Sequence, residues 1–335
     1  MLNQETLDLK NLLDNFAKTQ ILDEATAENL IQNGADIEVI SSELNILTAA
    51  IKAKSLNLTQ FLINHGVNVN KCIDQTNSSP LFHAIYNKCY PIGELLIQNG
   101  ANVNHQDIEA NTAFFHLFFF RDQLEDWVNL LINNGADVTI ANRYGNTPLH
   151  VAINYPNTPI PQLLINNGAD KEAKNIFGDT PLFTAVKNKN LAGVELMLNN
   201  GAELDVVNND DITPLHFAAE IGCPVTVEAL INLGADVNKQ DDLGRTPLYK
   251  SALTENSAAA EVLIQNNADL ELTDVLGQKP IEIAFIINNV DTKEVFKTYV
   301  PTEEYTILEN EYKDENPPIE NIEGVNNLVT KDYLQ

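Results

Sequence analysis

A phrase of the form Leu-Ile-x-Asn-Gly recurs along this chain at a nearly constant interval, and this periodicity restricts the possible folds more than any other feature. Seven copies end in glycine, and an eighth has Asn267 in that place. A period of this length indicates stacked units, each too small to bury its apolar face alone. The glycines lie 32 to 35 residues apart, at Gly34, Gly66, Gly100, Gly135, Gly168, Gly201 and Gly234.

A second phrase, Thr-Pro-Leu-His-x-Ala and its variants, runs in step with the first, as at Thr147 and Thr213. A threonine hydroxyl can cap the first free N–H groups of a helix, and proline fits the first helical position. Glycine ends a helix cheaply in the left-handed conformation, and asparagine tolerates that conformation. We therefore expect two short antiparallel helices in each period, followed by a polar, turn-rich segment that suits a hairpin loop.

With these two phrases in register at about 33 residues, the chain resembles the ankyrin repeat family. The resemblance implies an all-α solenoid of paired antiparallel helices with protruding hairpin loops. It also implies binding of a partner protein on the concave face. We expect a divergent N-terminal capping helix pair over residues 1–40, an array of about eight repeats over 41–300, and an acidic C-terminal tail over 301–335.

Two repeats depart from the pattern in the turn between their helices. The third has Ala113 in place of proline and two extra residues before its glycine, which predicts a longer turn. The fourth places Pro156, Pro159 and Pro161 across that turn, so its second helix should start late.

Charge limits the partners. The chain has 20 Lys and Arg residues against 47 Asp and Glu residues, a net charge of −27. Such a chain repels phosphate backbones and anionic membrane surfaces, so we expect neither nucleic acid nor membrane as a partner. A protein partner with a basic surface is allowed.

Targeting and redox features are few. The N-terminal residues lack a basic segment followed by an apolar run, and no stretch approaches 18 apolar residues. Cys72, Cys89 and Cys223 form no CxxC pair, which favours reduced thiols over a disulfide scaffold or zinc module. We expect a monomer in the cytoplasm, or in the host cytoplasm if the protein is secreted.

Candidate catalytic residues are scarce. His150 and His216 occupy the fourth place of the repeating phrase, which Phe183 and Tyr249 fill elsewhere, so their place belongs to the fold. No nucleotide-binding, hydrolase or metalloprotease motif occurs. We expect a protein that is not an enzyme and that uses no cofactor and no metal.

The aromatic run of the third repeat is a first candidate contact. Five phenylalanines between Phe114 and Phe120 cannot all point inward from one short helix. The run is either core only, or core with an exposed partner anchor, for which Phe119 and Phe120 are the candidates. Trp127 falls at an apolar position of the following helix, where burial is expected.

The hairpin tips are a second candidate. In the ankyrin family, residues around the tip glycine and at the start of the inter-helix turn usually face the partner. Folding requires no apolar residue at a tip, so apolar tips favour binding over a purely structural role. The resemblance assigns these residues to partner binding: Arg143, Tyr144, Tyr155, Ile176, Phe177, Asp242, Leu243, Arg245, Val275 and Leu276.

The acidic residues of 302–335 leave two interpretations open. The segment is a solvated extension, disordered or loosely docked. Alternatively, it resembles the glutamate-rich C-terminal signals of bacterial type IV effectors. We favour a secreted bacterial effector that engages a host protein, and the alternative is an endogenous adaptor or toxin-neutralising protein in the producing cell.

Overall fold

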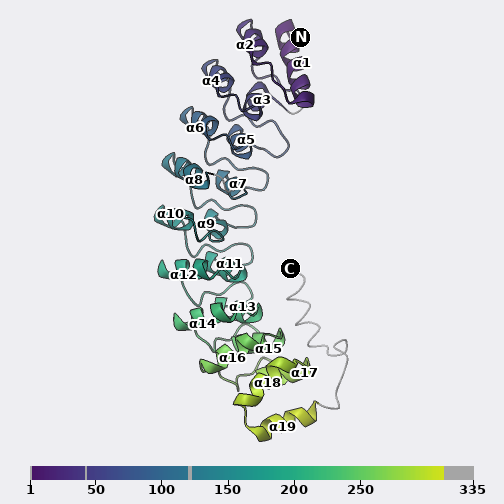
Figure 1. The fold of residues 1–335 in the computed structure, drawn as a ribbon, viewed down its shortest axis with the longest axis vertical. Helices are drawn as coiled ribbons and strands as arrows, with labels where there is room; N and C mark the ends of the chain where they lie inside the picture. Colours follow the sequence, from purple (N-terminus) through teal and green to yellow (C-terminus); the bar gives the residue numbers. More distant parts are fainter. Residues whose placement is uncertain (1, 42–43, 120–122, 313–335) are drawn as a thin grey trace. The chain divides into compact units, whose positions relative to one another are not determined.

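The computed structural model describes residues 2–41, 44–119 and 123–312. These ranges contain nineteen helices and no strand, with an isolated bridge between Ser41 and Leu44. Successive helices pair into an inner helix, beside the hairpin loops, and an outer helix (Figure 1). The predicted all-α solenoid of paired helices is confirmed.

The N-terminal unit, Met1–Asp170, contains five helix pairs. Inner helices pack on inner helices, α1 on α3, α3 on α5, α5 on α7 and α7 on α9. The bounds are α1 (Gln4–Thr19), α2 (Glu24–Gln32), α3 (Ile46–Lys52), α4 (Leu56–Asn64), α5 (Pro80–Tyr86), α6 (Tyr90–Gln98), α7 (Ala113–Leu117), α8 (Leu124–Asn133), α9 (Pro148–Ala152) and α10 (Ile160–Asn166).

The C-terminal unit, Lys171–Gln335, repeats this arrangement and adds one helix. Its inner helices α11, α13, α15 and α17 again pack in sequence. The bounds are α11 (Pro181–Lys187), α12 (Leu191–Asn199), α13 (Pro214–Glu220), α14 (Pro224–Asn232), α15 (Pro247–Leu253), α16 (Ser257–Gln265), α17 (Pro280–Ile286), α18 (Val290–Tyr299) and α19 (Thr302–Glu311).

The repeating phrases act at the helix ends as expected. At α13, the Thr213 hydroxyl accepts from the His216 N–H at 3.3 Å, and His216 Nδ1 accepts from the Thr213 N–H at 3.3 Å. These bonds satisfy N–H groups that a helix start leaves without a partner. At the other end, Gly168 has φ +91° and Asn267 has φ +65°, the left-handed conformation that stops the outer helix.

Both irregular turns lie where the sequence places them. Three residues separate the helices of most repeats, as at residues 87–89 between α5 and α6. Residues 118–123 separate α7 from α8, and residues 153–159 separate α9 from α10. The predictions of a longer turn in the third repeat and a late second helix in the fourth are confirmed.

In each unit, an apolar layer between the inner and outer helices forms the core. Trp127 is 3% exposed, which confirms its predicted burial. A Cβ at Gly93 would lie 2.1 Å from the Trp127 ring, so α6 accommodates this indole only because residue 93 has no side chain. The packing of a large residue, Trp127, on a glycine of the neighbouring repeat thus sets how closely α6 and α8 approach.

The segment after residue 301 corrects one expectation. Its first ten residues form α19, which packs on α17 and buries Tyr305 and Leu308. The Tyr305 ring meets Phe285 edge to face, with centroids 5.3 Å apart. A loosely docked or disordered start is therefore wrong, because apolar side chains one helical turn apart give this acidic stretch a buried face. Residues 313–335 lie outside the described ranges.

Candidate interaction surface

An aspartate or asparagine shapes each hairpin of the central repeats. In the fifth repeat, Asn175 Oδ1 accepts from the N–H groups of Phe177 and Asp179, and Asp241 Oδ1 accepts in the same way from Leu243 and Arg245. These bonds close a turn that projects the two residues after the anchor. The position of the anchor, five residues before the helix-capping threonine, thus determines which side chains lie at each tip.

Apolar side chains are exposed at two tips of the C-terminal unit. The exposed fractions are 53% for Ile176, 44% for Phe177, 65% for Val275 and 62% for Leu276. Backbone bonds connect neighbouring tips, with Asn209 N–H donating to Phe177 O and Val275 N–H to Leu243 O. These side chains are therefore presented to solvent on loops that hydrogen bonds hold in place.

The seventh repeat corrects part of the predicted contact surface. Asp242 is exposed and Leu243 partly exposed, but Arg245 is only 4% exposed. Arg245 Nε donates to Asp241 Oδ2 at 2.8 Å, so the guanidinium faces the interior of the repeat. The assignment of Arg245 to partner contact is wrong, because its own hairpin anchor binds it.

A buried ionic cluster surrounds Arg245. Lys250 is fully buried, with Nζ 3.3 Å from Glu220 Oε2 and 4.0 Å from Asp241 Oδ2. His216 Nε2 lies 2.9 Å from the Arg245 carbonyl, and burial lowers the pKa of His216 to about 4. The neutral imidazole then donates to that carbonyl. The cluster stabilises the repeat and offers no group to a ligand.

Tips of the N-terminal unit are also exposed. Tyr144 is 44% exposed, and the Arg143 guanidinium lies 5.0 Å from its ring centroid. Arg143 also pairs with Glu109, and its N–H donates to the Glu109 carbonyl at 2.9 Å. Tyr144 and Arg143 are thus exposed, as the tip assignment expects. The role of these tips in partner binding stays a prediction.

The aromatic run of the third repeat divides between core and surface. Phe114, Phe115 and Phe118 are buried, while Phe119 is 76% exposed. The interpretation as core only is therefore wrong for Phe119, and its role as a partner anchor stays a prediction. The second candidate, Phe120, lies outside the described residues.

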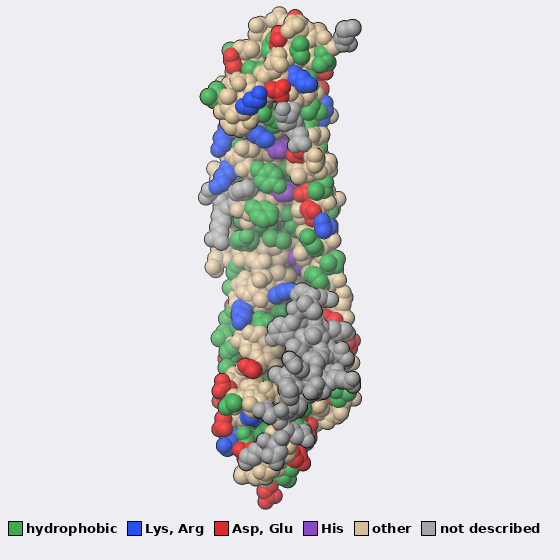
Figure 2. Space-filling model, turned by 90° about the vertical axis from the view of Figure 1, so that its right-hand side faces the viewer, with side chains coloured by type: hydrophobic (Ala, Val, Ile, Leu, Met, Phe, Trp, Pro, Cys, Tyr) green, Lys and Arg blue, Asp and Glu red, His purple; other side chains and the backbone are tan. Residues whose placement is uncertain are grey.

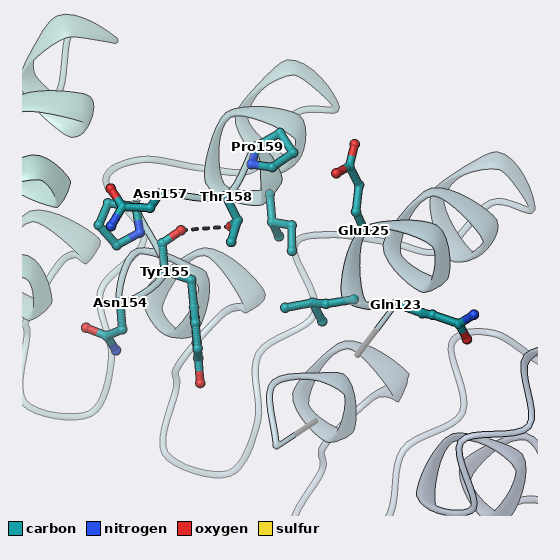
Figure 3. Close-up of a pocket in the computed structure, with 10 residues that line it drawn as sticks. Gln123, Glu125, Asn154, Tyr155, Asn157, Thr158 and Pro159 are labelled. Atoms are coloured by element: carbon teal, nitrogen blue, oxygen red, sulfur yellow. Dashed lines mark hydrogen bonds between the residues drawn. The ribbon is translucent and has the colours of Figure 1, made fainter. Parts of the chain in front are cut away.

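The two irregular turns line a pocket of about 600 Å³ (Figure 3). Tyr155 is partly exposed there and stacks on Phe118, and its hydroxyl donates to the Phe118 carbonyl at 2.9 Å. The Thr158 hydroxyl donates to the Tyr155 carbonyl at 2.8 Å, which fixes the turn. Prolines and amides with one carboxylate, Glu125, suit recognition of a side chain rather than proton transfer.

One hydrogen-bonded chain of titratable groups escaped the sequence analysis. The Tyr86 hydroxyl lies 2.6 Å from His116 Nδ1, and His116 Nε2 lies 3.2 Å from Asp107 Oδ2. Burial lowers the pKa of His116 and raises the pKa of Tyr86 to about 12. A phenol that holds its proton so firmly is a poor nucleophile near neutral pH, so we regard the chain as structural. The shared spacing of Asp74 to His83 and Asp107 to His116 is the sequence signal.

Exposed residues at the ends of inner helices were also missed. Lys52, Tyr86 and Phe119 lie 33 or 34 residues apart, and all three are exposed. Each lies seven residues after the residue that caps its inner helix. Lys52 and Tyr86 end α3 and α5, while Phe119 lies in the turn after α7. Alignment of the repeats by their helix-capping residues would have placed these three residues at one position.

Metal and membrane features were sought in the described ranges. There, no group of three or more His, Cys, Asp and Glu side chains is arranged to hold a metal ion. None of the helices described is both long and apolar enough to cross a bilayer.

Comparison with known families finds a model of ankyrin repeats that matches three times. The matches cover residues 18–107, 115–208 and 185–274, more than half of the chain.

Individual relatives match over shorter stretches. A B-cell lymphoma 3 protein homolog of Mus musculus is 32% identical over 133 residues, which is 39% of this chain and 28% of that protein. An ankyrin repeat protein of Fowlpox virus (strain NVSL) is 30% identical over 112 residues, 33% of each chain. An ankyrin repeat protein of Acanthamoeba polyphaga mimivirus is 29% identical over 116 residues, 34% of this chain and 15% of that protein. The matched part thus spans about a third or less of these relatives.

Proposed function

Since the chain belongs to the ankyrin repeat family, we propose that it is a non-catalytic scaffold that binds a partner protein. The observation that carries this proposal is the exposure of Ile176, Phe177, Val275 and Leu276 at hydrogen-bonded hairpin tips. An exposed apolar tip contributes little to the core, whereas a binding partner can bury it. A rigid frame lowers the entropy that binding costs.

The test is affinity capture with tip variants. Ile176→Ser with Phe177→Ser, and Val275→Ser with Leu276→Ser, should unfold within about 0.5 kcal/mol of the parent chain, because the side chains are exposed. A protein captured by the parent chain and lost with either variant supports the scaffold. Val225→Ser, which removes an apolar side chain 57% exposed on the outer helix α14, is the matched control. Equal capture by parent and variants would place the contact elsewhere.

A finer proposal concerns where the scaffold acts. We infer a secreted bacterial effector that binds a host protein, and the acidic composition of residues 302–335 supports it. Fusion of this segment to a translocation reporter tests the idea, with Glu303, Glu304, Glu309 and Glu311 changed to Gln as the control. Export that does not depend on these glutamates would contradict an acidic signal.

The second candidate is an endogenous adaptor or toxin-neutralising protein. Neutralisation needs a binding surface, which the hydrogen-bonded hairpin loops supply, and it needs no export. Co-expression with the captured partner in the producing cell separates the two proposals. Relief of toxicity would support neutralisation, whereas a captured partner found only in a host cell would support the effector.

A further inference from the structure

Two irregular turns of the N-terminal unit converge on one pocket. Three residues join the helices of most repeats, whereas residues 118–123 and 153–159 form longer turns in the third and fourth repeats. The pocket of about 600 Å³ is lined by Gln123, by the first residues of α8 and by residues 154–160. It therefore results from the departure of two adjacent repeats from the common pattern, and the repeat fold itself does not require it.

Hydrogen bonds hold the wall of this pocket in place. The Tyr155 N–H donates to the Ala152 carbonyl at 2.8 Å, and the Thr158 N–H donates to the Tyr155 carbonyl at 3.1 Å. The Tyr155 hydroxyl connects the two turns, because it donates to the Phe118 carbonyl at 2.9 Å. Binding to a wall that is already ordered costs little conformational entropy.

Part of the lining is apolar. Leu124 at the start of α8 is 7% exposed, and Ile160 at the start of α10 is 1% exposed. Pro156 and Pro159 extend this apolar lining. Long charged side chains cover such surfaces with their methylene groups while the charged end stays near water. The lining thus suits a side chain that has an apolar stem.

The polar groups of fixed orientation in the pocket are acceptors. The Tyr155 hydroxyl donates its proton to the Phe118 carbonyl, and the Thr158 hydroxyl donates to the Tyr155 carbonyl at 2.8 Å. Each hydroxyl oxygen therefore keeps only its capacity to accept. Pro156 and Pro159 have no N–H to donate. The side-chain amides of the lining both donate and accept, so they favour neither kind of ligand.

Glu125 supplies a charged acceptor. Figure 3 shows its carboxylate at the start of α8, across from Thr158 and Pro159, whereas Gln123 points away from the pocket. Glu125 is exposed, and none of the ten lining residues is basic. Within the described part of the chain it forms no ion pair. This carboxylate is therefore available to a ligand that carries hydrogen-bond donors.

The turn that ends at Gln123 also carries an exposed aromatic side chain, Phe119, which is 76% exposed. Figure 2 shows hydrophobic side chains gathered around α7 on the face that it draws. A partner segment that reaches the pocket thus has apolar surface available in the same repeat. Such surface adds contact area and leaves the chemistry of the pocket unchanged.

From these contacts we propose that the pocket receives an arginine side chain of the partner protein. The guanidinium pairs with the Glu125 carboxylate and donates to the Thr158 hydroxyl oxygen, while its methylene stem covers Leu124 and Ile160. Arginine fits better than lysine, because its donors lie in a planar fork that serves separate acceptors and because it is more weakly hydrated. The proposal rests on the scaffold function and names the chemistry of its ligand. It agrees with the basic partner surface that the net charge allows.

An anion and an apolar side chain fit this pocket less well. Glu125 and Asp126 occupy the first turn of α8, so the positive end of that helix dipole is already beside its own carboxylates. An apolar side chain would separate the Glu125 carboxylate from water without replacing its hydrogen bonds, which is unfavourable. The experiment therefore includes both.

The test is a titration of the full chain, labelled with nitrogen-15, with blocked amino acids followed by nuclear magnetic resonance. The probes are the N-acetyl methylamides of arginine, lysine, leucine and glutamate. We expect the arginine probe to shift the amide signals of Leu124, Thr158 and Ile160 to saturation. Its dissociation constant should be at least about threefold below that of the lysine probe, and at least about tenfold below those of the leucine and glutamate probes.

Two results of the titration would overturn the proposal. The first is equal or tighter binding of the lysine, leucine or glutamate probe. The second is a set of shifts spread over other acidic surfaces without saturation at Leu124, Thr158 and Ile160, because general attraction to the net charge of −27 would then explain the binding.

Two variants locate the site. Glu125→Gln should weaken binding of the arginine probe by about tenfold or more, because the amide keeps the size of the side chain and removes its charge. Asp126→Asn is the matched control, since it removes the same charge from the same helix turn at an exposed residue outside the lining. It should change the affinity by less than about twofold.

Equal losses of affinity in Glu125→Gln and Asp126→Asn would overturn the pocket as the binding site. Both positions are exposed, so both variants should fold like the parent chain. Failure of this proposal is distinguishable from failure of the scaffold, because that function is tested at tips of the C-terminal unit with Glu125 intact.

Discussion

The third and seventh repeats use the same hairpin aspartate in two different electrostatic settings. Asp107 and Asp241 both accept loop N–H groups through Oδ1. Asp107 Oδ2 then faces His116, whose pKa burial lowers, while Asp241 Oδ2 faces Arg245 and the buried Lys250. The residues four and nine positions later, Arg245 and Lys250 in the seventh repeat against Asn111 and His116 in the third, thus decide whether the hairpin buries a formal ion pair. In both repeats the turn is the same, but the free energy of unfolding that is lost when the aspartate is replaced should differ.

The sharpest way to break this comparison is Asp241→Asn. Asn142, Asn175 and Asn208 hold the same turn in other repeats, so the amide preserves the loop and removes only the charge beside Arg245 and Lys250. Breaking a buried ion pair costs about 3–5 kcal/mol. We expect that loss in the free energy of unfolding by chemical denaturation. Asp242→Asn, at the exposed neighbour, should change the free energy of unfolding by less than about 0.5 kcal/mol. A similar loss in both variants would contradict a stabilising role for the ion pairs of Asp241.

The pH dependence of stability should come next in size. His216 has a usual pKa of 6.5, lowered by burial to about 4 in the folded chain. As the pH falls below 6.5, the unfolded chain takes up a proton that the folded chain refuses until about pH 4. Acid therefore destabilises the fold across this window, by on the order of 3 kcal/mol. His216→Phe, the residue type at Phe183, should remove this part of the slope, and denaturation from pH 7 to 4 with unchanged slope would contradict it.

Asp107→Asn sharpens the other side of the comparison. The amide again preserves the turn, and the partner His116 is neutral, so no formal charge is left buried. We expect a loss of about 1.5–3 kcal/mol, the contribution of a hydrogen bond to a charged group. Denaturation measured beside Asp241→Asn checks the difference. Equal losses for Asp107→Asn and Asp241→Asn would mean that the charged partners of Asp241 do not determine the free energy lost.

The smallest effects should come from exposed apolar residues in the two units. Phe119→Ser and Leu276→Ser remove side chains that are 76% and 62% exposed. The free energy of unfolding should change by less than about 0.5 kcal/mol for each. Phe118→Ala, one residue away and 6% exposed, should cost about 3–5 kcal/mol by loss of packing. A thermal melt that shifts as much for Phe119→Ser as for Phe118→Ala would place Phe119 in the core.

Periodicity alone sufficed for the fold. Thr-Pro and Asn-Gly phrases specify where helices start and stop through local backbone chemistry, so the helix pairs and both irregular turns could be predicted from residues close in sequence. The late start of α10 followed from three prolines in the same way. Exposure of Tyr144, Ile176 and Val275 followed because tip positions repeat with the fold.

Other features depended on side-chain contacts that the repeating pattern does not encode. Arg245 was predicted at the surface, yet Asp241 draws it inward and Lys250 is buried beside it. The start of the acidic segment forms α19, which packs on α17 with the Tyr305 ring against Phe285.

Charge shows the same division. The sequence determined the net value of −27, but only tertiary structure decided that Lys250 is fully buried while Lys52 and Lys54 are exposed. The physical reason is that total charge is a sum over residues, whereas the field that a ligand meets depends on which side chains are exposed together and which are already paired.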